Sequence, residues 1–408
     1  MDEAPKASSP FVELGSSGLR RYGGHLDEER LKELRGAKGV AVYREMAQNH
    51  PVIGAILFSI KMLCRQAKAN VQEASQDPED IEAKLFLESC FQDMSHTWEE
   101  CLGEILSMLE YGWSYLETVY KVRGGDSQDP TRRSRFDDGR IGWRKIALRG
   151  QDTLQDWVFD ESGGIQAMRQ NAPPDYRTRT IPIDKALLFR PEAAKNSPEG
   201  RSVLRNAYTS YYASKHFMRI WGIGIERDLN GIPVAWVPPE MLGANATSEM
   251  TTNLTAIKKI VTQIRNDEQA GLVFPLAYNE AGQKKYDLTL LSSGGKRNFD
   301  LVAAMAYLDQ KIAQTVLADM ILIGHGDTGS FALMEQKVDL FSQALDAWMD
   351  SIAEVFNRHA IPRLFRLNGF KLKALPRLQF QKVAKLGLSE ISAFVTAMSG
   401  AGMVTPSP

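Results

Sequence analysis

The sequence has few cysteines, and none of them lies at a metal-binding spacing. Its 408 residues include only Cys64, Cys90 and Cys101, and no two of these form a CxxC pair. Each lies in an apolar pattern typical of a helix, so we expect buried thiols in a reducing compartment. The six histidines form no HExxH motif. The sequence therefore predicts neither disulfides nor a bound metal ion.

Long uncharged segments are also missing. The longest run without a charge follows Glu390 and contains Gly400, Gly402 and two prolines. A membrane-spanning helix needs about 20 mostly apolar residues, so this run is a poor candidate. The chain begins Met-Asp-Glu-Ala-Pro-Lys, without the basic and then apolar regions of a signal peptide. We expect no membrane partner.

Neither sign of charge is in excess. The 49 lysines and arginines nearly balance the 50 aspartates and glutamates, giving a formal net charge of −1. Bulk electrostatics therefore does not recruit nucleic acid, and any contact with DNA must come from local placement of charge. With 43% hydrophobic and 24% charged residues, the composition is that of a soluble globular protein. The length suits two or three domains, or one elongated subunit.

Motifs that would identify an enzyme are scarce. The segment Gly324-His-Gly-Asp-Thr-Gly329 matches GxGxxG, but a dinucleotide site also needs a second strand and an acidic residue about 20 positions further on. A long helical pattern follows here instead. GxSxG, GxxxxGK[ST] and a carboxylate cluster at metal spacing are all absent from the sequence. We expect no catalysis and no cofactor. A reaction at His325 and Asp327, or a plain helical connector, remain as alternatives.

Two apolar helical patterns flank this glycine-rich loop. The second has a mean period of 3.5 residues and predicts a helix of roughly 45 Å that ends near Ala360. Its apolar positions are Phe331, Met334, Val338, Phe341, Leu345, Trp348, Ile352 and Val355. The first pattern has Leu301, Met305, Leu308, Ile312, Val316 and Met320 on one stripe.

The N-terminal half mixes helical and strand patterns. We expect an extended arm over residues 1–40, a helix from Ala41 interrupted at Pro51, and one helix from the Asp77-Pro78 cap to Gly112. Period-two segments then predict a small mixed sheet with strands at 115–121, 141–148, 157–159, 165–168 and 186–189. A charged loop over 123–140 is expected to be solvated, with a contact surface as the alternative.

A second helix start lies at Ser197-Pro198 and predicts a helix that continues to about Asp228. The pattern is apolar on more than one face, so the helix either lies in a central core or touches both neighbours in a ring of identical subunits. Further on, we expect strands at 234–237, 271–275, 286–291 and 375–381, and helices at 248–267 and 389–398. The fold class is α+β, mainly helical.

The order of these elements resembles the portal protein of tailed bacteriophages. The most specific piece is Gly-Arg-Ser-Val-Leu-Arg-Asn-Ala-Tyr, residues 200–208, in the segment that opens a long helix, which ends in a Gly-Ile-Pro turn. A small α/β insertion, a second helix, the glycine-rich loop and the long helix follow. The resemblance implies an arm (1–40), a wing (41–198), a first stem helix (199–228), a clip (229–294), a second stem helix (295–321), a tunnel loop (322–330), a spine helix (331–361) and a wing return with a short crown (362–408).

The resemblance also implies a function and partners. Portal proteins form a ring, usually of twelve subunits, at one vertex of the capsid, and double-stranded DNA is packaged and ejected through it. The implied partners are other copies of the chain, DNA, the terminase, the major capsid protein or scaffold, and a head–tail adaptor. The implied location is the virion, with the host cytoplasm during assembly. The alternatives are a soluble α+β enzyme that uses the 324–329 loop, and a structural oligomer unrelated to DNA.

Candidate site residues follow from this comparison. The tunnel loop would supply small, flexible residues whose backbone can approach phosphates: Gly324, His325, Gly326, Asp327, Thr328, Gly329 and Ser330. Stem charges that face the channel or a neighbouring subunit would be Lys215, Arg219, Arg227 and Lys311. Solvated or inter-subunit ion pairs are the alternative for these. Contacts between the clip and the terminase or adaptor would involve Lys258, Lys259 and Arg265, unless these form a solvated helix face.

Overall fold

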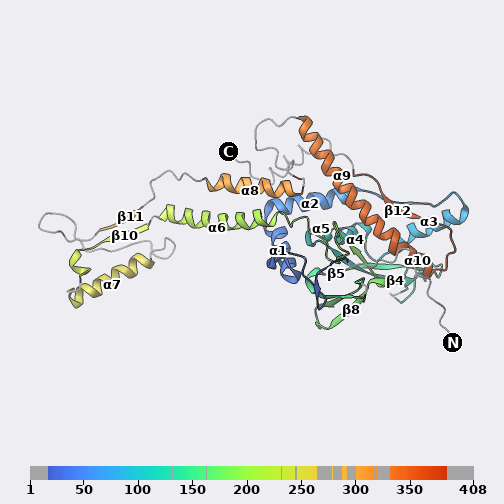
Figure 1. Ribbon diagram of the computed structural model, residues 1–408, viewed down its shortest axis with the longest axis horizontal. Coiled ribbons are helices and arrows are strands. Elements are labelled where there is room, and N and C mark those ends of the chain that lie inside the picture. Colours follow the sequence, from blue (N-terminus) through green and yellow to red (C-terminus); the bar gives the residue numbers. More distant parts are fainter. Residues whose placement is uncertain are drawn as a thin grey trace. The chain divides into compact units, whose positions relative to one another are not determined.

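The computed structural model describes residues 17–129, 132–161, 163–230, 232–243, 246–263, 278, 287–291, 300–316, 318 and 331–383 (Figure 1). It divides the chain into two compact units. Unit 1 comprises Met1–Tyr211 and Asp309–Pro408, and unit 2 comprises Tyr212–Leu308. Among the described residues, no helix combines the length and apolar character that crossing a bilayer requires.

The start of unit 1 is folded rather than extended. A hairpin of β1 (Arg21–Tyr22) and β2 (His25–Leu26) is followed by a 3-10 turn, η1 (Lys32–Leu34). Helix α1 (Gly36–Asn49) begins five residues before the predicted start. The expectation of an extended arm is therefore wrong for residues 17–40, and residues 1–16 lie outside the described part. The predicted interruption at Pro51 is confirmed, because α2 (Pro51–Gln66) begins there.

The single helix predicted between Asp77 and Gly112 is wrong, because three helices occupy this stretch. They are α3 (Pro78–Gln92), α4 (Trp98–Ile105) and α5 (Ser107–Tyr111). Thr97 starts α4 with a reciprocal capping box, in which its hydroxyl accepts from Glu100 N and the Glu100 carboxylate accepts from Thr97 N. The apolar spacing continues across both breaks because each of the three helices buries apolar side chains.

Two three-stranded antiparallel sheets replace the predicted mixed sheet. One has the order β5-β4-β9 and the other β6-β7-β8. The five predicted strands are confirmed in place, whereas β8 was not anticipated because its Thr-Arg-Thr sequence is polar and exposed. The bounds are β4 (Ser114–Val122), β5 (Ile141–Arg149), β6 (Leu154–Phe159), β7 (Ile165–Asn171), β8 (Thr178–Pro182) and β9 (Ala186–Phe189).

The C-terminal part of unit 1 returns along the N-terminal helices. The predicted long helix is confirmed as α9 (Phe331–Val355), which continues through a π-helical segment, Phe356–Ala360, into α10 (Ile361–Leu367). Pro362 does not end the helix, and it lies in the first turn of α10, directly after the π-helical segment. The predicted strand near 375–381 is confirmed as β12 (Arg377–Phe380), which pairs with β3 (Ala69–Gln72).

The largest core cluster joins α2, the α3–α5 helices, the β5-β4-β9 sheet and the α9–α10 segment. The cysteines lie inside it as free, buried thiols, as predicted. Burial raises the pKa of Cys64 and of Cys90 to about 12, so both thiols stay protonated and unreactive at neutral pH.

The remaining elements extend from the boundary between the units into unit 2. Helix α6 (Tyr208–Asn230) begins eleven residues after the predicted start at Ser197. A polar helix, α7 (Ser248–Gln263), and the antiparallel pair β10 (Ile232–Trp236) and β11 (Asp287–Leu291) follow. Helix α8 (Leu301–Thr315) leads back to unit 1. The predicted strand at 271–275, the helix at 389–398 and the loop at 322–330 lie outside the described residues.

Candidate functional site

The motif that carries the family resemblance does not form the first turns of α6. It forms the segment directly before that helix, residues 200–207, which is called the root of α6 here. Residues 203–207 form turns, and the segment before α6 contacts α5. The Ser202 hydroxyl donates to Glu110 O at 2.6 Å, and Val203 N donates to Leu109 O at 3.1 Å. These bonds satisfy the last carbonyls of a short helix. They explain why the Ser197-Pro198 signal does not start a helix.

Gly200 allows this close approach. A Cβ atom at this position would lie only 2.5 Å from Gly112 O, well inside normal contact distance. Gly112 itself has a φ of +88° and ends α5 in the left-handed region. The two glycines therefore let the backbone before α6 touch the end of α5, which fixes where α6 starts.

An ion pair ties the root of α6 to the N-terminal segment. Arg205 donates from Nη2 to Glu29 Oε1 at 2.7 Å and from Nε to Oε2 at 2.5 Å. This bidentate geometry is the favourable one for arginine and a carboxylate. Burial alone would raise the pKa of Glu29, but the bond from Arg205 and a backbone bond from Leu31 hold it below its usual range.

The root of α6 also lines a cavity of about 510 Å³. Its walls come from the 26–36 segment, from Tyr43 and Tyr111, and from residues 192–206. Glu199 belongs to this wall, and its Oε1 accepts from the indole of Trp157 at 3.0 Å. Burial raises the pKa of Glu199, so this carboxyl lacks a strong countercharge.

Helix α6 exposes large apolar side chains on opposite faces. Tyr212 is 64% exposed and Trp221 is 38% exposed. These two residues are nine positions apart, which places them about 180° around the helix. Met218, Ile220 and Ile223 are exposed as well. The prediction that this helix is apolar on more than one face is confirmed, and one chain alone leaves those faces in water.

The predicted charged residues that the structure describes lie on α6, α7 and α8. Lys215 and Arg219 are exposed one turn apart on α6, and Lys258 and Lys259 are exposed on α7. Lys311 is half-buried on α8 and donates to Gln314 Oε1 at 3.2 Å. Arg227 belongs to α6, but its side chain lies outside the description. Arg265 and the tunnel-loop residues 324–330 also lie outside it, so their predicted roles stay predictions.

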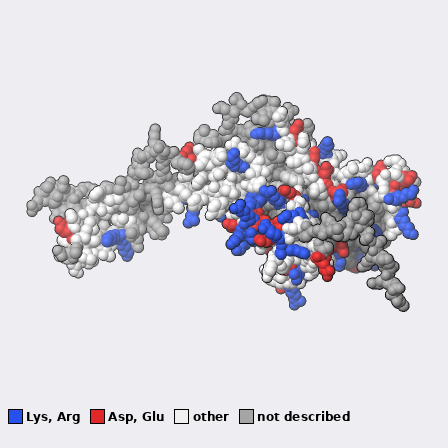
Figure 2. Space-filling model, in the orientation of Figure 1, with Lys and Arg blue, Asp and Glu red and all other residues white. Residues whose placement is uncertain are grey.

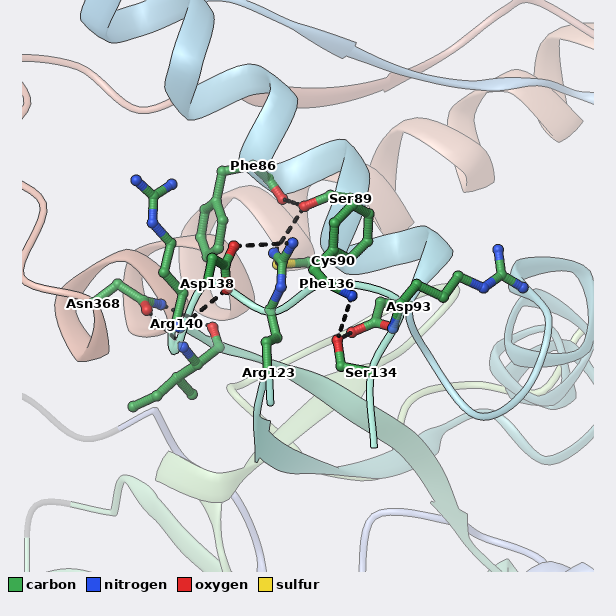
Figure 3. Close-up of polar contacts among 12 residues, drawn as sticks. Phe86, Ser89, Cys90, Asp93, Arg123, Ser134, Phe136, Asp138, Arg140 and Asn368 are labelled. Atoms are coloured by element: carbon green, nitrogen blue, oxygen red, sulfur yellow. Dashed lines mark hydrogen bonds and ion pairs between the residues drawn. The ribbon is translucent and has the colours of Figure 1, made fainter. Parts of the chain in front are cut away.

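The charged loop at 123–140 is anchored far more firmly than expected (Figure 3). Arg123, at its start, is only 1% exposed. Its guanidinium donates to Ser89 Oγ at 2.9 Å, forms an ion pair with Asp138 at 3.1 Å and lies 4.1 Å from the ring centroid of Phe136. The expectation of a solvated loop is therefore wrong at its base, while the side chains of Arg132, Arg133 and Arg135 are exposed.

A buried ion pair between Asp93 and Lys121 also anchors the charged loop. Asp93, after the end of α3, accepts from Ser134 Oγ at 2.6 Å and from Arg135 N at 2.9 Å (Figure 3). Lys121 Nζ lies 3.0 Å from Asp93 Oδ2. Burial would raise the pKa of Asp93, but these hydrogen bonds and the lysine outweigh it and hold the pKa below its usual range.

Two asparagine side chains connect the α9–α10 segment to strands. Each forms the pair of backbone hydrogen bonds that a neighbouring strand would form. Asn368 accepts from Ile141 N at 2.7 Å and donates to Ile141 O at 2.9 Å. Asn357 forms the same reciprocal pair with Leu378. Sequence patterns gave no sign of either residue, because each partner is distant along the chain.

We expect Asn368→Ala to lower the free energy of unfolding by about 1–3 kcal/mol, because it leaves two partly buried backbone groups without their partner. Asn368→Asp keeps the acceptor and loses the donor, so its effect should fall between those of Ala and the native residue. Urea unfolding with an unchanged m value measures both. Gln92→Ala, at an exposed position in α3, is the control. Equal stability of Asn368→Ala and the control would contradict this role.

The described part of the chain offers exposed surfaces that suit association with other chains. Among those residues, no three His, Cys, Asp or Glu side chains lie close enough to hold a metal ion. The features that stand out are the exposed faces of α6, its anchored root with the adjoining cavity, and the charged loop at 123–140, which is anchored at its base.

A family model and several solved structures are similar to this chain. The family model described as "Portal protein of Mu bacteriophage" matches residues 40–408. The fold is similar to a chain in the neck of an empty gene transfer agent particle, with a TM-score of 0.52 and 15% identity over 90% of this chain and 91% of that one. A chain of the virion of the native gene transfer agent particle gives 0.50 and 14%, over 90% and 91%. An HK97-family phage portal protein from Corynebacterium diphtheriae gives 0.44 and 11%, over 87% and 97%. At these identities the structural likeness is one of fold, whereas the family model spans nearly the whole sequence, and the chain belongs to the family of Mu bacteriophage portal proteins.

Proposed function

We propose that this chain assembles into a ring of twelve identical subunits at one vertex of a phage capsid and that double-stranded DNA passes through the ring. The observation that carries this proposal is α6, whose large apolar side chains are exposed on opposite faces of the helix. A helix of this kind needs cover on both sides, and a ring supplies a neighbour on each side. In this proposal the chain has no catalytic step of its own.

The channel wall would be weakly cationic. Lys215 and Arg219 are exposed one turn apart on α6, where they could face the DNA. Each phosphate contact that releases a counterion strengthens binding, so many such contacts would stop the DNA from sliding. A subunit with a net charge of −1 and only scattered cations avoids that outcome. The glycine-rich loop at 324–330 would contact the DNA backbone as it moves.

The other proposed surfaces serve partners. Unit 2 would contain the clip, where Lys258, Lys259 and Arg265 could meet the terminase or a head–tail adaptor. Unit 1 would contain the wing, which meets the major capsid protein or scaffold. The assembled ring would be located in the virion, after assembly in the host cytoplasm.

Native mass spectrometry of the purified chain tests the ring directly. The proposal expects a closed oligomer whose mass is a whole multiple of 45.6 kDa, and electron-microscopy class averages with a central opening. A monomer or dimer under every assembly condition would contradict it. A closed ring without an opening wide enough for DNA would favour a structural oligomer with another role.

Deleting residues 325–328 should separate assembly from DNA movement. We expect rings of the same size as those of the native protein, because the exposed faces of α6 are unchanged. We expect the amount of DNA packaged per particle to fall, because the loop proposed to contact the backbone of the moving DNA is lost. Mass spectrometry of the rings and a nuclease-protection packaging assay measure the two effects. Loss of ring assembly would show instead that the loop is structural.

A further inference from the structure

Two of the arginines that line the cavity at the root of α6 form no ion pair within the described part of the chain. Glu28 pairs with Lys195 at 2.9 Å, and Glu29 is occupied by Arg205. In contrast, Arg30 and Arg201 line the cavity without an ion-pair partner in the described part of the chain. The Arg201 guanidinium donates to the neutral side chain of Asn206 at 2.7 Å.

The two arginines are accessible at the surface beside this cavity. Arg30 and Arg201 are both exposed, as is the nearby Lys32. Figure 2 shows lysine and arginine side chains gathered over the α1 region of unit 1, with acidic side chains among them. Of the acids that line the cavity, Glu28 and Glu29 are paired, Glu199 is half-buried with a raised pKa, and the exposed Glu192 has no ion-pair partner among the described residues. The two arginines can still attract a carboxylate from another copy.

An acidic projection of the same unit offers the complementary chemistry. The first turn of α3 and the residue before it contain Asp77, Glu79 and Asp80. Asp77 occupies the N-cap position, but its carboxylate makes no capping bond. Asp77 and Glu79 are exposed, and neither has an ion-pair partner among the described residues. Asp80 accepts from Ser75 Oγ at 2.6 Å.

These two surfaces lie on different sides of unit 1. In Figure 1, α1 and α3 stand at opposite ends of that unit. A ring of identical subunits requires a head-to-tail interface, in which one surface of a copy meets a different surface of the next. One surface that bound itself would close a dimer instead. An acidic projection and a cavity with two unpaired arginines, on one chain, meet the requirement for a ring.

We propose that the first turn of α3 in one copy docks at the cavity beside the root of α6 in the next copy, with Asp77 and Glu79 facing Arg30 and Arg201. This inference rests on the proposed ring and names one of its contacts. Exposed ion pairs are individually weak and are screened by salt. The contact therefore selects the partner surface and its register, while the apolar faces of α6 contribute the larger buried area.

Reversing charges on one side or on both sides tests the contact. We expect Arg30→Glu with Arg201→Glu to reduce the ring fraction at fixed protein concentration by about tenfold or more, because like charges then face each other at every interface. Asp77→Lys with Glu79→Lys should do the same. All four changes in one chain should restore rings. Arg177→Glu, an exposed arginine in the turn before β8, is the matched control and should assemble normally.

Cross-linking gives an independent readout that does not depend on charge. The native cysteines are buried, so new surface thiols should react selectively. We expect a chain with Arg30→Cys and Glu79→Cys to form a ladder of covalent oligomers on oxidation, while either single variant does not. Circular dichroism of each variant checks that unit 1 is folded.

The outcomes separate this contact from the ring itself. Rings of native protein, together with unchanged assembly of both charge-reversed pairs and no covalent ladder, would overturn the contact and leave the ring proposal standing. Failure of the fourfold variant to recover when each pair alone is disrupted would also overturn it. Absence of rings from the native protein would overturn both.

Discussion

Replacing Asp93 by alanine is expected to lower the free energy of unfolding by about 3–5 kcal/mol, the usual range when one partner of a buried ion pair is removed. The substitution leaves the Lys121 ammonium buried, with its side chain only 6% exposed. It also removes the acceptor for Ser134 Oγ and Arg135 N. Chemical denaturation with a constant m value measures the loss.

A matched control lies in the same loop. Asp137→Ala, at an exposed position, should change the free energy of unfolding by less than about 0.5 kcal/mol. Asp93→Asn keeps most of the shape but lacks the charge, so it should fall between alanine and the native residue. If Asp93→Ala is as stable as Asp137→Ala, the loop is not anchored through this carboxylate.

The same carboxylate predicts a dependence of stability on pH. The pKa of Asp93 is held below its usual range in the folded protein, so the folded state favours the ionised form. Its contribution is therefore complete above the unfolded-state pKa near 4 and is lost as the pH falls through the lower folded-state pKa. Native protein should lose more stability than Asp93→Asn between neutral pH and that acidic range.

Phe356→Ala should cost about 3–5 kcal/mol of unfolding free energy, the range for removing a large side chain from a packed core. Phe356 is fully buried in the π-helical segment after α9. Its ring centroid lies 5.4 Å from that of Trp98, 5.7 Å from Phe189 and 6.0 Å from Phe91. The residue therefore joins α9 to α3, α4 and the β5-β4-β9 sheet at one point.

Two further variants test the packing at this position. Phe356→Leu fills more of the space and should lose less stability than alanine. Phe58→Ala removes a phenylalanine that is 56% exposed on α2, so its effect should be much smaller. Similar losses for Phe356→Ala and Phe58→Ala would contradict a packed aromatic core around the π-helical segment.

Local sequence patterns predicted the elements that depend on local information. The period of 3.5 along residues 331–355 was sufficient for α9, because burial of one face repeats along one helix. The apolar faces of α6 were predicted for the same reason. The strands β4 and β5 alternate clearly enough to be placed within one or two residues.

Tertiary contacts decided the parts that were predicted wrongly. Ser197-Pro198 has the residues of a helix start, but bonds from Ser202 to α5 favour turns until Tyr208. The strands were placed correctly, but single-strand patterns do not reveal which strand pairs with which, so two sheets were taken for one. Both errors concern partners that are distant in sequence.

The charged loop at 123–140 shows the same limit, because local patterns do not reveal partners that are distant in sequence. Its charges were visible, but the partner of Ser134 is Asp93, 41 residues earlier. Nothing in the local pattern distinguishes the buried Arg123 from the exposed Arg132. The stem and clip charges could be proposed only through the family resemblance, since a channel exists only between subunits and one chain does not display it.

Cryo-electron microscopy of the assembled protein tests the central claim most directly. The account predicts a closed ring with a central opening wide enough for duplex DNA, with Lys215, Arg219 and residues 324–330 around that opening. A ring in which these residues lie far from the symmetry axis, or inside the fold of a single chain, would contradict it.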